Sequence, residues 1–450
     1  MYVARTMSRV AVSIVAAAAL AACLSDGAAE PTAPTVTETT VETTVDPGPG
    51  FTIPPPPGDA VRWSVDTSSC ADPEAAEAEI TTSITIGTAA PQSGGLISSI
   101  YAPVLVGFQA YIDQANADRV LGDVRIELEI ADDKGQPELT PVAVDGLLDA
   151  GASVISALPG SVNNLAVRQF LNMNCVPQVM SLANTPRLGD PRNFPWTMGG
   201  VVTEAVETTI YANAIHRDLD DDATVAILVT NDDSGTSYAG AFAAAADEIG
   251  IDVVVQQTVE PAVIDPPSAQ MLTIAGERPQ VIVASLSGAA CATFLTELDK
   301  ARIALADWQP EVYLGSDCAD SSILRLAGNA ANGVLSSASL VSDDPGFVEL
   351  MRGAGLANGF ARAEQGWTAA EVTVEMLRQA QQSEAGLTRA TIIEAARSLA
   401  FTPSLARPGV EYTTNGVLDA YPVESLQIVR YDAATQGFVD VGRLIAQFES

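Results

Sequence analysis

The chain has 450 residues, 47% of them hydrophobic, which is enough for two domains or for one large domain with its own core. Its formal net charge at pH 7 is −34, and Lys134 and Lys300 are its only lysines. This balance argues against nucleic acid binding and against a polybasic membrane patch, because both need clustered Lys and Arg. It is typical of a solvated surface that keeps an exported protein in solution.

An export signal is predicted at residues 1–22. Arg5 and Arg9 precede an apolar run at 10–20, and the run ends in the letters LAAC. The run is shorter than the roughly 20 residues of a membrane-spanning helix, and its charged start and small-residue end are those of a secretory signal. The LAAC ending resembles a bacterial lipobox, which implies cleavage before Cys23 and lipid attachment to this cysteine. An ordinary signal peptide with an incidental cysteine is the alternative.

The segment 23–75 is predicted to be a disordered stalk. Thr, Pro, Ala, Glu and Gly dominate its first part, as in the letters PTAPTVTETTVETTVDPGPG and IPPPPG. Such a composition cannot bury enough apolar surface to offset the entropy of ordering, and its prolines keep the chain extended.

From Ile80 onward, short β-type runs alternate with longer amphipathic runs, a pattern typical of βαβ units and a parallel sheet. A first set of strands is read in the letters ITIGTAA, VRIELEIADD, VISAL and VPQVMSL, and a second in VAILVT, DVVVQQTV, VIVAS and VYLG. Helices at 347–351, 363–382 and 388–398 are predicted to return to the first set. The letters VESLQIVRYDAATQGFVDVG then predict a strand, a turn and a strand.

The stretch at 154–188 organises the first set, because it reads strand, loop, helix, strand, loop. Two parallel strands would end in loops that hold Ser161 and Thr185, so both hydroxyls would lie at one carboxyl edge of the sheet. Open α/β sheets bind ligands at that edge, and an amide-rich loop that opens a helix favours anions. The sequence therefore predicts a capture site for the carboxylate of a small metabolite.

Six segments carry a family resemblance. The letters SITIGTAAPQSG, DDKGQPELTPVAVDGLLDAGASVISALPGS, ANTPRL, VAILVTNDDSG, LGSDCAD and TTNGVLDAYPVESLQIVRYD fall in the order and spacing of the type I periplasmic-binding-protein superfamily. The branch that the chain most resembles is the leucine/isoleucine/valine-binding-like substrate-binding proteins of ABC importers. No single motif is diagnostic, but the ordered series from Ile84 to the C-terminus is specific.

The resemblance implies an α/β fold with two doubly wound parallel-sheet lobes, a three-segment hinge and a ligand in the cleft between the lobes. Lobe 1 would comprise 76–200 and 342–415, and lobe 2 would comprise 201–341 and 416–450. The chain would change lobes near 199–202, 339–342 and 411–421.

The resemblance also implies a ligand set on lobe 1. Ser161 and Thr185 match positions whose hydroxyls and amides hold the ligand carboxylate, although Gly160 competes with Ser161 for the matching place. Ala183 would contribute its backbone carbonyl, and Asn184 its N–H or its side chain.

On lobe 2, Asp317 aligns with the acidic residue that takes the ligand's ammonium group, and Asp320 is the competing carboxylate. A charge-assisted hydrogen bond there would contribute ~1.5–3 kcal/mol. Helix capping without ligand contact is the alternative role for Asp317, and equally for Ser161 and Asn163.

One departure from the family pattern concerns Ser234, which stands in the letters NDDSG where relatives usually have a tyrosine that packs on the ligand. The smaller side chain widens the mouth, so a branched-chain amino acid is not assured as the ligand. Tyr238, one helical turn on, is the candidate to replace the missing ring. Tyr101, Ser93 and Ser287 are weaker candidates for the side-chain pocket, and an aromatic such as Tyr101 is as often core.

Four cysteines follow Cys23, and they are predicted to form two disulfides. Cys291 and Cys318 follow the ends of neighbouring strands, which lie ~4.8 Å apart, within the ~4.4–6.8 Å Cα spacing of a disulfide. This bond would stiffen the loop that carries Asp317. Cys70 and Cys175 would then pair by elimination and fasten the end of the stalk to lobe 1.

Other classes of protein fit less well. His216 is the only histidine and sits in a predicted exposed helix, and no GxSxG motif occurs, so no enzyme, metal or cofactor is expected. A receptor of this fold needs a transmembrane segment, and none follows Val439. A ligand-free or sensory lipoprotein that acts through protein contacts stays open, with Ser234 as its best support.

The resulting interpretation is a monomeric substrate-binding protein, tethered by lipid to the outer face of the bacterial cytoplasmic membrane. We expect it to deliver an amino acid or a similar small polar metabolite to ABC permease subunits.

Overall fold

The computed structural model describes residues 63–219, 223–261, 265–341, 344–416 and 418–448. The predicted signal peptide, Cys23 and most of the predicted stalk lie outside these residues. Among the described residues, no helix is both long enough and apolar enough to cross a membrane.

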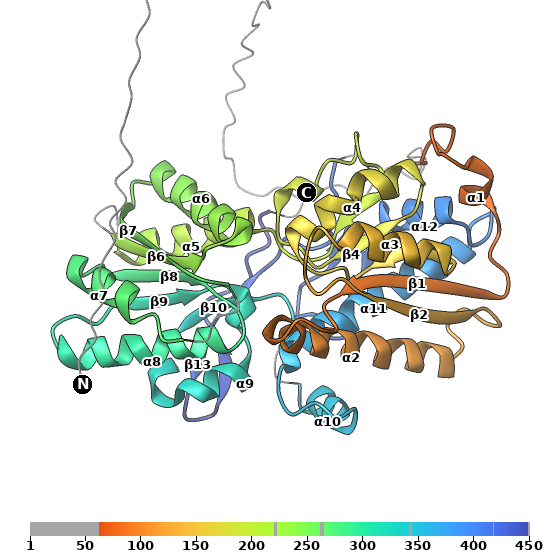
Figure 1. Cartoon of the computed structure of the whole chain (residues 1–450). Helices are drawn as coiled ribbons and strands as arrows, with labels where there is room; N and C mark the ends of the chain where they lie inside the picture. Colours follow the sequence, from red (N-terminus) through yellow and green to blue (C-terminus); the bar gives the residue numbers. More distant parts are fainter. Residues whose placement is uncertain (1–62, 220–222, 262–264, 342–343, 417, 449–450) are drawn as a thin grey trace, which may run out of the picture. The chain divides into compact units, whose positions relative to one another are not determined.

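The first lobe is built on a five-stranded parallel sheet with strand order β2-β1-β3-β4-β5. Figure 1 shows the neighbouring strands β1 and β2 of this sheet. Its strands are β1 (Ser83–Ala90), β2 (Arg125–Asp132), β3 (Ala152–Ser156), β4 (Gln178–Ser181) and β5 (Thr197–Gly199). Most positions of β1, β3, β4 and β5 are buried, as expected for parallel strands covered on both faces, whereas β2 is the partly exposed edge.

Helices cover both faces of this sheet. α2 (Leu96–Ala117), α11 (Phe360–Gln381) and α12 (Arg389–Ala396) share one core cluster with β1, whereas α3 (Thr140–Asp149) and α4 (Ser161–Met173) share another with β3. Ile84 and Ile86 face the first cluster, and Ala89 and Ile155 the second. The sheet is therefore doubly wound, as the sequence predicted.

The second lobe is built on a seven-stranded sheet with strand order β14-β13-β10-β9-β8-β6-β7. Its parallel strands are β6 (Thr224–Thr230), β7 (Asp252–Val259), β8 (Val281–Ser285), β9 (Glu311–Leu314) and β10 (Leu335–Ala338). The antiparallel edge is formed by β13 (Gln427–Asp432) and β14 (Gly437–Asp440), which are the predicted strand, turn and strand at the end of the chain.

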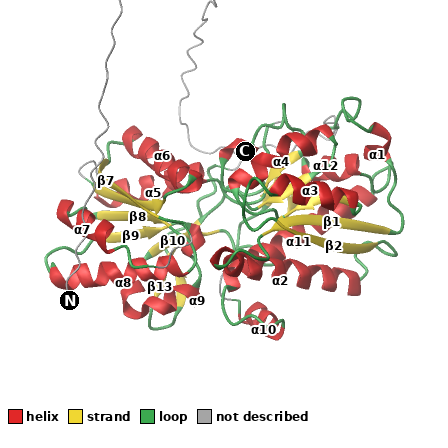
Figure 2. Cartoon of the chain, viewed as in Figure 1, coloured by secondary structure: helices red, strands yellow, loops and turns green. Residues whose placement is uncertain are grey.

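This second sheet is also covered on both faces, as the red helices around the yellow strands show (Figure 2). α5 (Glu204–Leu219) and α6 (Asp233–Glu248) pack on one face, and α7 (Ser268–Glu277) and α8 (Ala289–Ala304) on the other. Short helices η3 (Ser316–Cys318), α9 (Ser321–Leu324) and η4 (Arg325–Ala331) follow β9. The two-lobed α/β fold expected from the sequence is confirmed.

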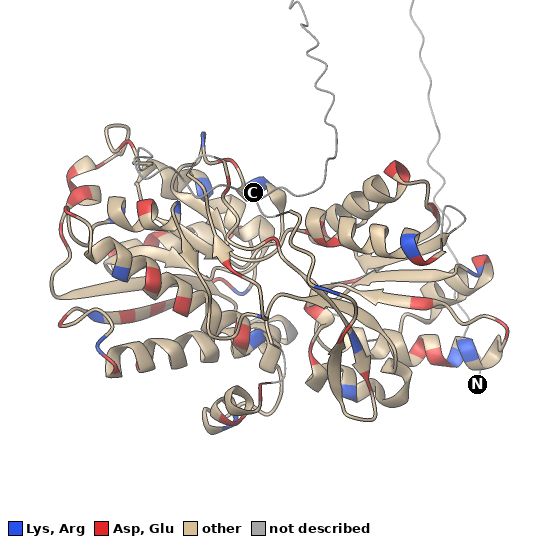
Figure 3. Ribbon diagram, turned by 180° about the vertical axis from the view of Figure 1, so that it is seen from behind, with Lys and Arg blue, Asp and Glu red and all other residues tan. Residues whose placement is uncertain are grey.

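The chain passes between the two sheets three times: between β5 and α5, between β10 and α10 (Pro345–Gly353), and between β12 (Tyr412–Thr413) and β13. β12 pairs with β11 (Ala400–Phe401) in a small two-stranded sheet. The lobe and hinge boundaries predicted above remain predictions. Acidic residues lie on helices and loops of both lobes (Figure 3).

The folded part begins ahead of the predicted end of the stalk at residue 75. Cys70 is buried and forms a disulfide with Cys175 (Cα–Cα 5.5 Å), and the helix α1 (Pro73–Glu77) follows it. The backbone N–H of Ala71 donates to the carbonyl of Met173 at 2.8 Å. Composition alone could not place this boundary, because a covalent bond and a few hydrogen bonds order the segment.

Candidate functional site

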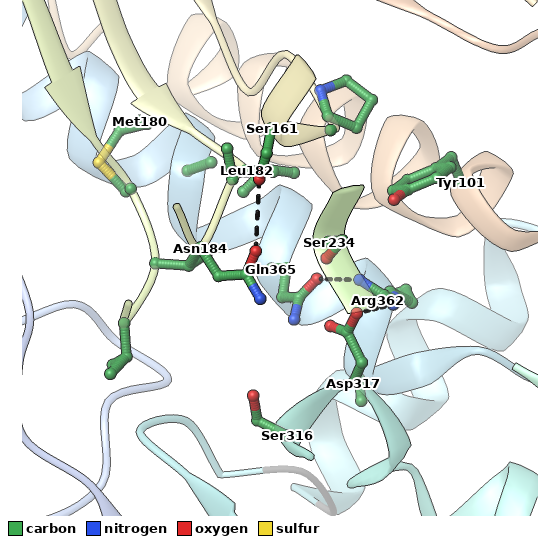
Figure 4. A pocket seen from close by; sticks show the side chains of 18 of the residues that line it. Tyr101, Ser161, Met180, Leu182, Asn184, Ser234, Ser316, Asp317, Arg362 and Gln365 are labelled. Atoms are coloured by element: carbon green, nitrogen blue, oxygen red, sulfur yellow. Dashed lines mark hydrogen bonds and ion pairs between the residues drawn. The ribbon is translucent and has the colours of Figure 1, made fainter. Parts of the chain in front are cut away.

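A cavity of about 450 Å³ lies between the two lobes. From lobe 1 it is lined by the start of α4, the loop after β4, and the faces of α2 and α11; from lobe 2 it is lined by the start of α6, η3 and the end of β10. Figure 4 shows the side chains that point into it. Of the residues predicted from sequence, it brings together Tyr101, Ser161, Ala183, Asn184, Ser234 and Asp317.

The amino end of α4 faces this cavity. Its N-cap is Gly160, at a φ of 89°, and no side chain caps the helix. The first N–H groups of a helix have no partner within the helix, and they carry its partial positive charge. Because residues 160–163 line the cavity, this helix end is suited to hold a carboxylate.

The alternative in which Ser161 and Asn163 only cap α4 is not what the structure shows. The Ser161 hydroxyl donates to Asn184 Oδ1 at 3.4 Å, a long hydrogen bond that joins the start of α4 to the loop after β4 (Figure 4). Asn163 Nδ2 donates to Thr140 Oγ1 at 2.8 Å and to Asp133 Oδ2 at 3.2 Å. Asn163 therefore links α4 to α3 and to the loop after β2, and it does not cap the helix.

Thr185 lies at the same sheet edge but lines a second cavity of about 340 Å³. Its hydroxyl accepts from the N–H of Arg187 at 3.3 Å and caps η1 (Pro186–Leu188), while its carbonyl accepts from the Tyr421 hydroxyl at 2.7 Å. The neighbouring carbonyl of Asn184 accepts from the N–H of Glu204 at 2.9 Å, so this loop also contacts lobe 2.

Asp317 is paired with a cation from the other lobe. Arg362, in the first turn of α11, lies 3.1 Å from the Asp317 carboxylate, and it also donates to Gln365 Oε1 at 3.1 Å (Figure 4). The Arg362 side chain is 14% exposed, against 45% for Asp317. A mostly buried guanidinium thus forms part of the cavity wall.

The pKa shifts around this pair follow from burial and charge. Burial acts to lower the pKa of Arg362, but the nearby Asp317 carboxylate keeps it above its ordinary value. The guanidinium carbon lies 5.6 Å from the ring centroid of Tyr101, whose own pKa is raised mainly by burial. Arg362 is therefore a permanent positive charge in the site.

The loop that carries Asp317 is held from behind by Glu207. The backbone N–H of Ser316 donates to Glu207 Oε1 at 2.8 Å, and the Ser337 hydroxyl donates to the same oxygen at 2.6 Å. Burial raises the pKa of Glu207, while these hydrogen bonds act in the opposite direction. The disulfide predicted between Cys291 and Cys318 is present (Cα–Cα 5.8 Å) and fixes the next residue of the loop.

Four predicted or competing residues lie away from both cavities. Tyr238 is buried in the lobe 2 core and so does not replace a ring in the cleft. The Ser93 hydroxyl donates to Asp132, and Ser287 lines neither cavity. Asp320 caps α9 by accepting from the N–H of Ser322 at 2.8 Å.

Sequence reasoning missed the contribution of α11, from which Arg362, Gln365 and Thr368 reach the cavity. Thr368 is 2% exposed, and its hydroxyl has no hydrogen-bond partner among the described residues. The predicted helix began at residue 363, but α11 begins at Phe360. The sequence did contain a signal, because an arginine in the first turn of a helix interacts unfavourably with the helix dipole. Its presence there indicates a role other than stabilising the helix.

A family model described as "Periplasmic binding protein" matches residues 83–436. The chain belongs to the periplasmic binding protein family. The family consists of non-enzymatic, extracytoplasmic solute-binding proteins, so this periplasmic binding protein is a small-molecule binder rather than an enzyme. No curated protein sequence matches the chain.

Solved structures share the fold of this periplasmic binding protein. A branched-chain amino acid ABC transporter protein from Thermus thermophilus with bound valine has a TM-score of 0.73 at 19% identity, covering 82% of this chain and 97% of that one. A leucine binding protein from Thermotoga maritima has a TM-score of 0.64 at 16% identity, covering 81% and 99%. A solute binding protein from R. palustris in complex with 4-hydroxybenzoate has a TM-score of 0.67 at 17% identity, covering 81% and 97%.

Proposed function

We propose that this protein is the substrate-binding component of an ABC importer and captures an amino acid or a related small carboxylate between its lobes. The observation that carries the proposal is the cavity of about 450 Å³, which has the uncapped end of α4 and the Arg362 guanidinium on lobe 1 and the Asp317 carboxylate on lobe 2. Lipid attachment at Cys23 and the permease partner belong to the same proposal.

In the proposed complex, the ligand carboxylate lies at the start of α4, near Ser161 and Asn184. An α-ammonium group then lies near Asp317, whose side chain is 45% exposed and contacts Arg362 through Oδ2. In this proposal the ammonium group donates to the other carboxylate oxygen of Asp317. Micromolar capture needs about −8 kcal/mol in total. Charge-assisted hydrogen bonds of ~1.5–3 kcal/mol each, together with contacts to Met180 and Leu182, are sufficient for this.

The capture step in this proposal is closure of the hinge. Solute binds to lobe 1 in an open form, and contacts with η3 and α6 are then made only in the closed form. A ligand shifts such an equilibrium only through its preference for one state. Contacts such as Asp317–Arg362 and the 3.0 Å hydrogen bond from Gly359 N–H to Ser322 Oγ join the lobes on one side of the cleft.

A second candidate ligand is an organic acid without an ammonium group. It is favoured by one observation: Asp317 already has a cationic partner, Arg362, so an ammonium group is not needed to neutralise it. A neighbour of the same fold is solved with 4-hydroxybenzoate. In this alternative, Arg362 supplies an extra attraction for the anion.

Isothermal titration calorimetry with L-leucine and 4-methylpentanoate tests the two candidates, because these probes share a carbon skeleton and differ in the ammonium group. If Asp317 recognises ammonium, L-leucine binds at least tenfold more tightly. The reverse order, with benzoate and 4-hydroxybenzoate also binding, supports the organic acid. If no member of an amino-acid and organic-acid panel produces heat of binding, the proposed capture is contradicted. The ligand-free scaffold is then the remaining interpretation.

Palmitate labelling in a bacterial host tests the lipid anchor. Cys23→Ala should abolish incorporation of the label and release the protein from the membrane fraction. Unchanged labelling would contradict attachment at this cysteine.

A further inference from the structure

The second cavity, of about 340 Å³, adjoins the first. Ser161, Val162, Asp233 and Ser234 line both. The short side chain of Ser234, at the start of α6, is part of this shared wall. A ligand in the first cavity therefore has the second cavity directly beside it.

The side chain that distinguishes the second cavity is Glu204, in the first turn of α5. Glu204 is 2% exposed and lines this cavity. One of its oxygens, Oε1, accepts from the Ser237 hydroxyl, but Oε2 has no hydrogen-bond partner among the described residues. A glutamate in the first turn stabilises a helix when it is hydrated, whereas burying a carboxylate oxygen that has no hydrogen-bond partner is destabilising.

The charges around Glu204 decide which ligand group suits it. Asp233 on α6 is a second carboxylate in the lining, and Glu207 lies one turn further along α5. The charged group of opposite sign in the lining is Arg187, which is exposed. The surroundings are therefore acidic and favour a cationic hydrogen-bond donor over an anion.

We propose that the second cavity is an extension of the ligand site, in which Glu204 binds a primary ammonium group at the far end of the ligand. The ligand class is then an amino acid with a basic side chain, whose carboxylate lies at α4 and whose distal amine reaches Glu204. This inference rests on the proposed capture of an amino acid between the lobes. It adds a charge requirement that the first cavity does not impose.

Calorimetry with L-lysine and L-norleucine tests the extension, because the two probes differ by the distal ammonium group. At pH 8 the wild-type protein should bind L-lysine at least tenfold more tightly than L-norleucine. In Glu204→Gln the ratio of the two affinities should fall to about one. Glu371→Gln is the matched control, because Glu371 is also a buried glutamate but lies on α11 outside both cavities and accepts from Ser404.

A pH series on the wild-type protein gives a second measurement that needs no variant. Burial raises the pKa of Glu204 to about 7, with a further increase from Glu207, although the bond from Ser237 acts to lower it. Asp233 on α6 and Arg187 in η1 are the other charged groups that line the cavity. The preference for L-lysine over L-norleucine should therefore grow from pH 6 to pH 8.

The outcomes separate this inference from the proposed function. Equal wild-type affinities for the two probes, or a lysine preference that survives in Glu204→Gln, overturn the extension while leaving capture of an amino acid intact. If neither these probes nor the amino-acid and organic-acid panel binds, both proposals fail together.

Discussion

Among single side chains, Asp317 and Arg362 set the charge balance of the cleft. They come from different lobes and lie 3.1 Å apart, and the arginine is the more buried partner. Removing one member of such a pair leaves the other charge without its partner, which costs more than the net contribution of the intact pair. Substitutions here therefore report both on the ligand and on closure.

Asp317→Ala should have opposite effects on the two candidate ligands. The site loses the carboxylate that accepts from the ammonium group of an α-amino acid, so the affinity for such a ligand should fall at least tenfold. An organic acid gains an unpaired guanidinium at Arg362, so its affinity should rise. Calorimetry measures both, and unchanged affinity for an amino acid would remove Asp317 from the proposed site.

The control for this substitution is Asp307→Ala. Asp307 forms a similar pair with Arg278 at 2.6 Å, but its side chain is 78% exposed and lies outside both cavities. Its removal should leave ligand affinity unchanged, because exposed pairs contribute little even to stability.

The difference between Ser161 and Arg362 shows which site residues the sequence could reveal. Ser161 follows a buried strand and opens a helix, so its place at the sheet edge was predictable from local pattern. Arg362 reaches the same cavity only because the chain returns to lobe 1 and α11 packs beside α2. Similarly, helical spacing from Ser234 could not show that Tyr238 faces the core of lobe 2. These placements depend on tertiary packing, which a linear pattern does not contain.

At the level of secondary-structure elements, the close crossing of α2 and α11 positions Arg362. A Cβ atom on Gly366 would lie 1.9 Å from the carbonyl oxygen of Val104, and one on Gly107 would lie 1.9 Å from that of Ala363. The two glycines thus allow the helix backbones to touch. Since α11 also lines the cavity, this contact fixes the distance of Arg362 from the sheet edge.

Gly366→Ala should destabilise the protein by at least ~1–3 kcal/mol, because the new methyl group overpacks a backbone contact that has no room to relax. Thermal unfolding measures the change. Gly240→Ala on α6 is the matched control, since nothing lies within 4 Å of its added Cβ. That control should stabilise slightly, because Ala is the better helix former. Equal melting temperatures for the two variants would contradict the packing argument.

Removing one disulfide should mainly affect stability, and removing the other should mainly affect ligand binding. In the chain-entropy model, closing a loop with a sequence separation of 27 residues contributes roughly 3.5 kcal/mol, and a separation of 105 residues roughly 5 kcal/mol. Replacing Cys70 and Cys175 by Ser should therefore lower the melting temperature more. Replacing Cys291 and Cys318 should weaken ligand binding more, because the second pair fixes the loop of Asp317. Equal losses of affinity in both double variants would contradict this division.

For the whole molecule, the pH dependence of stability follows from two groups of carboxyls with opposite shifts. Burial raises the pKa of Glu204 from 4.5 to about 7, and it also raises those of Glu207 and Glu371. In contrast, the pKa of Asp132 is lowered from 3.8 to about 2, mainly by a hydrogen bond from Ser93. The net charge of −34 adds a general repulsion that grows with pH and that salt screens.

We expect the protein to be most stable between about pH 4 and pH 5 and to lose stability towards pH 8. Between pH 4.5 and about 7 the folded state retains protons on the buried glutamates that the unfolded state has released, so stability falls as pH rises. Below about pH 3.8 the sign reverses, because Asp132 must be protonated on unfolding while it is still ionised in the folded state. In 1 M NaCl the repulsion between surface charges is screened, so the change of melting temperature with pH reports on the buried groups. Glu204→Gln should reduce the fall in melting temperature that remains between pH 5 and pH 8. A melting temperature that stays constant from pH 5 to pH 8 in high salt would contradict the buried, ionisable state of Glu204 on which the extended ligand site depends.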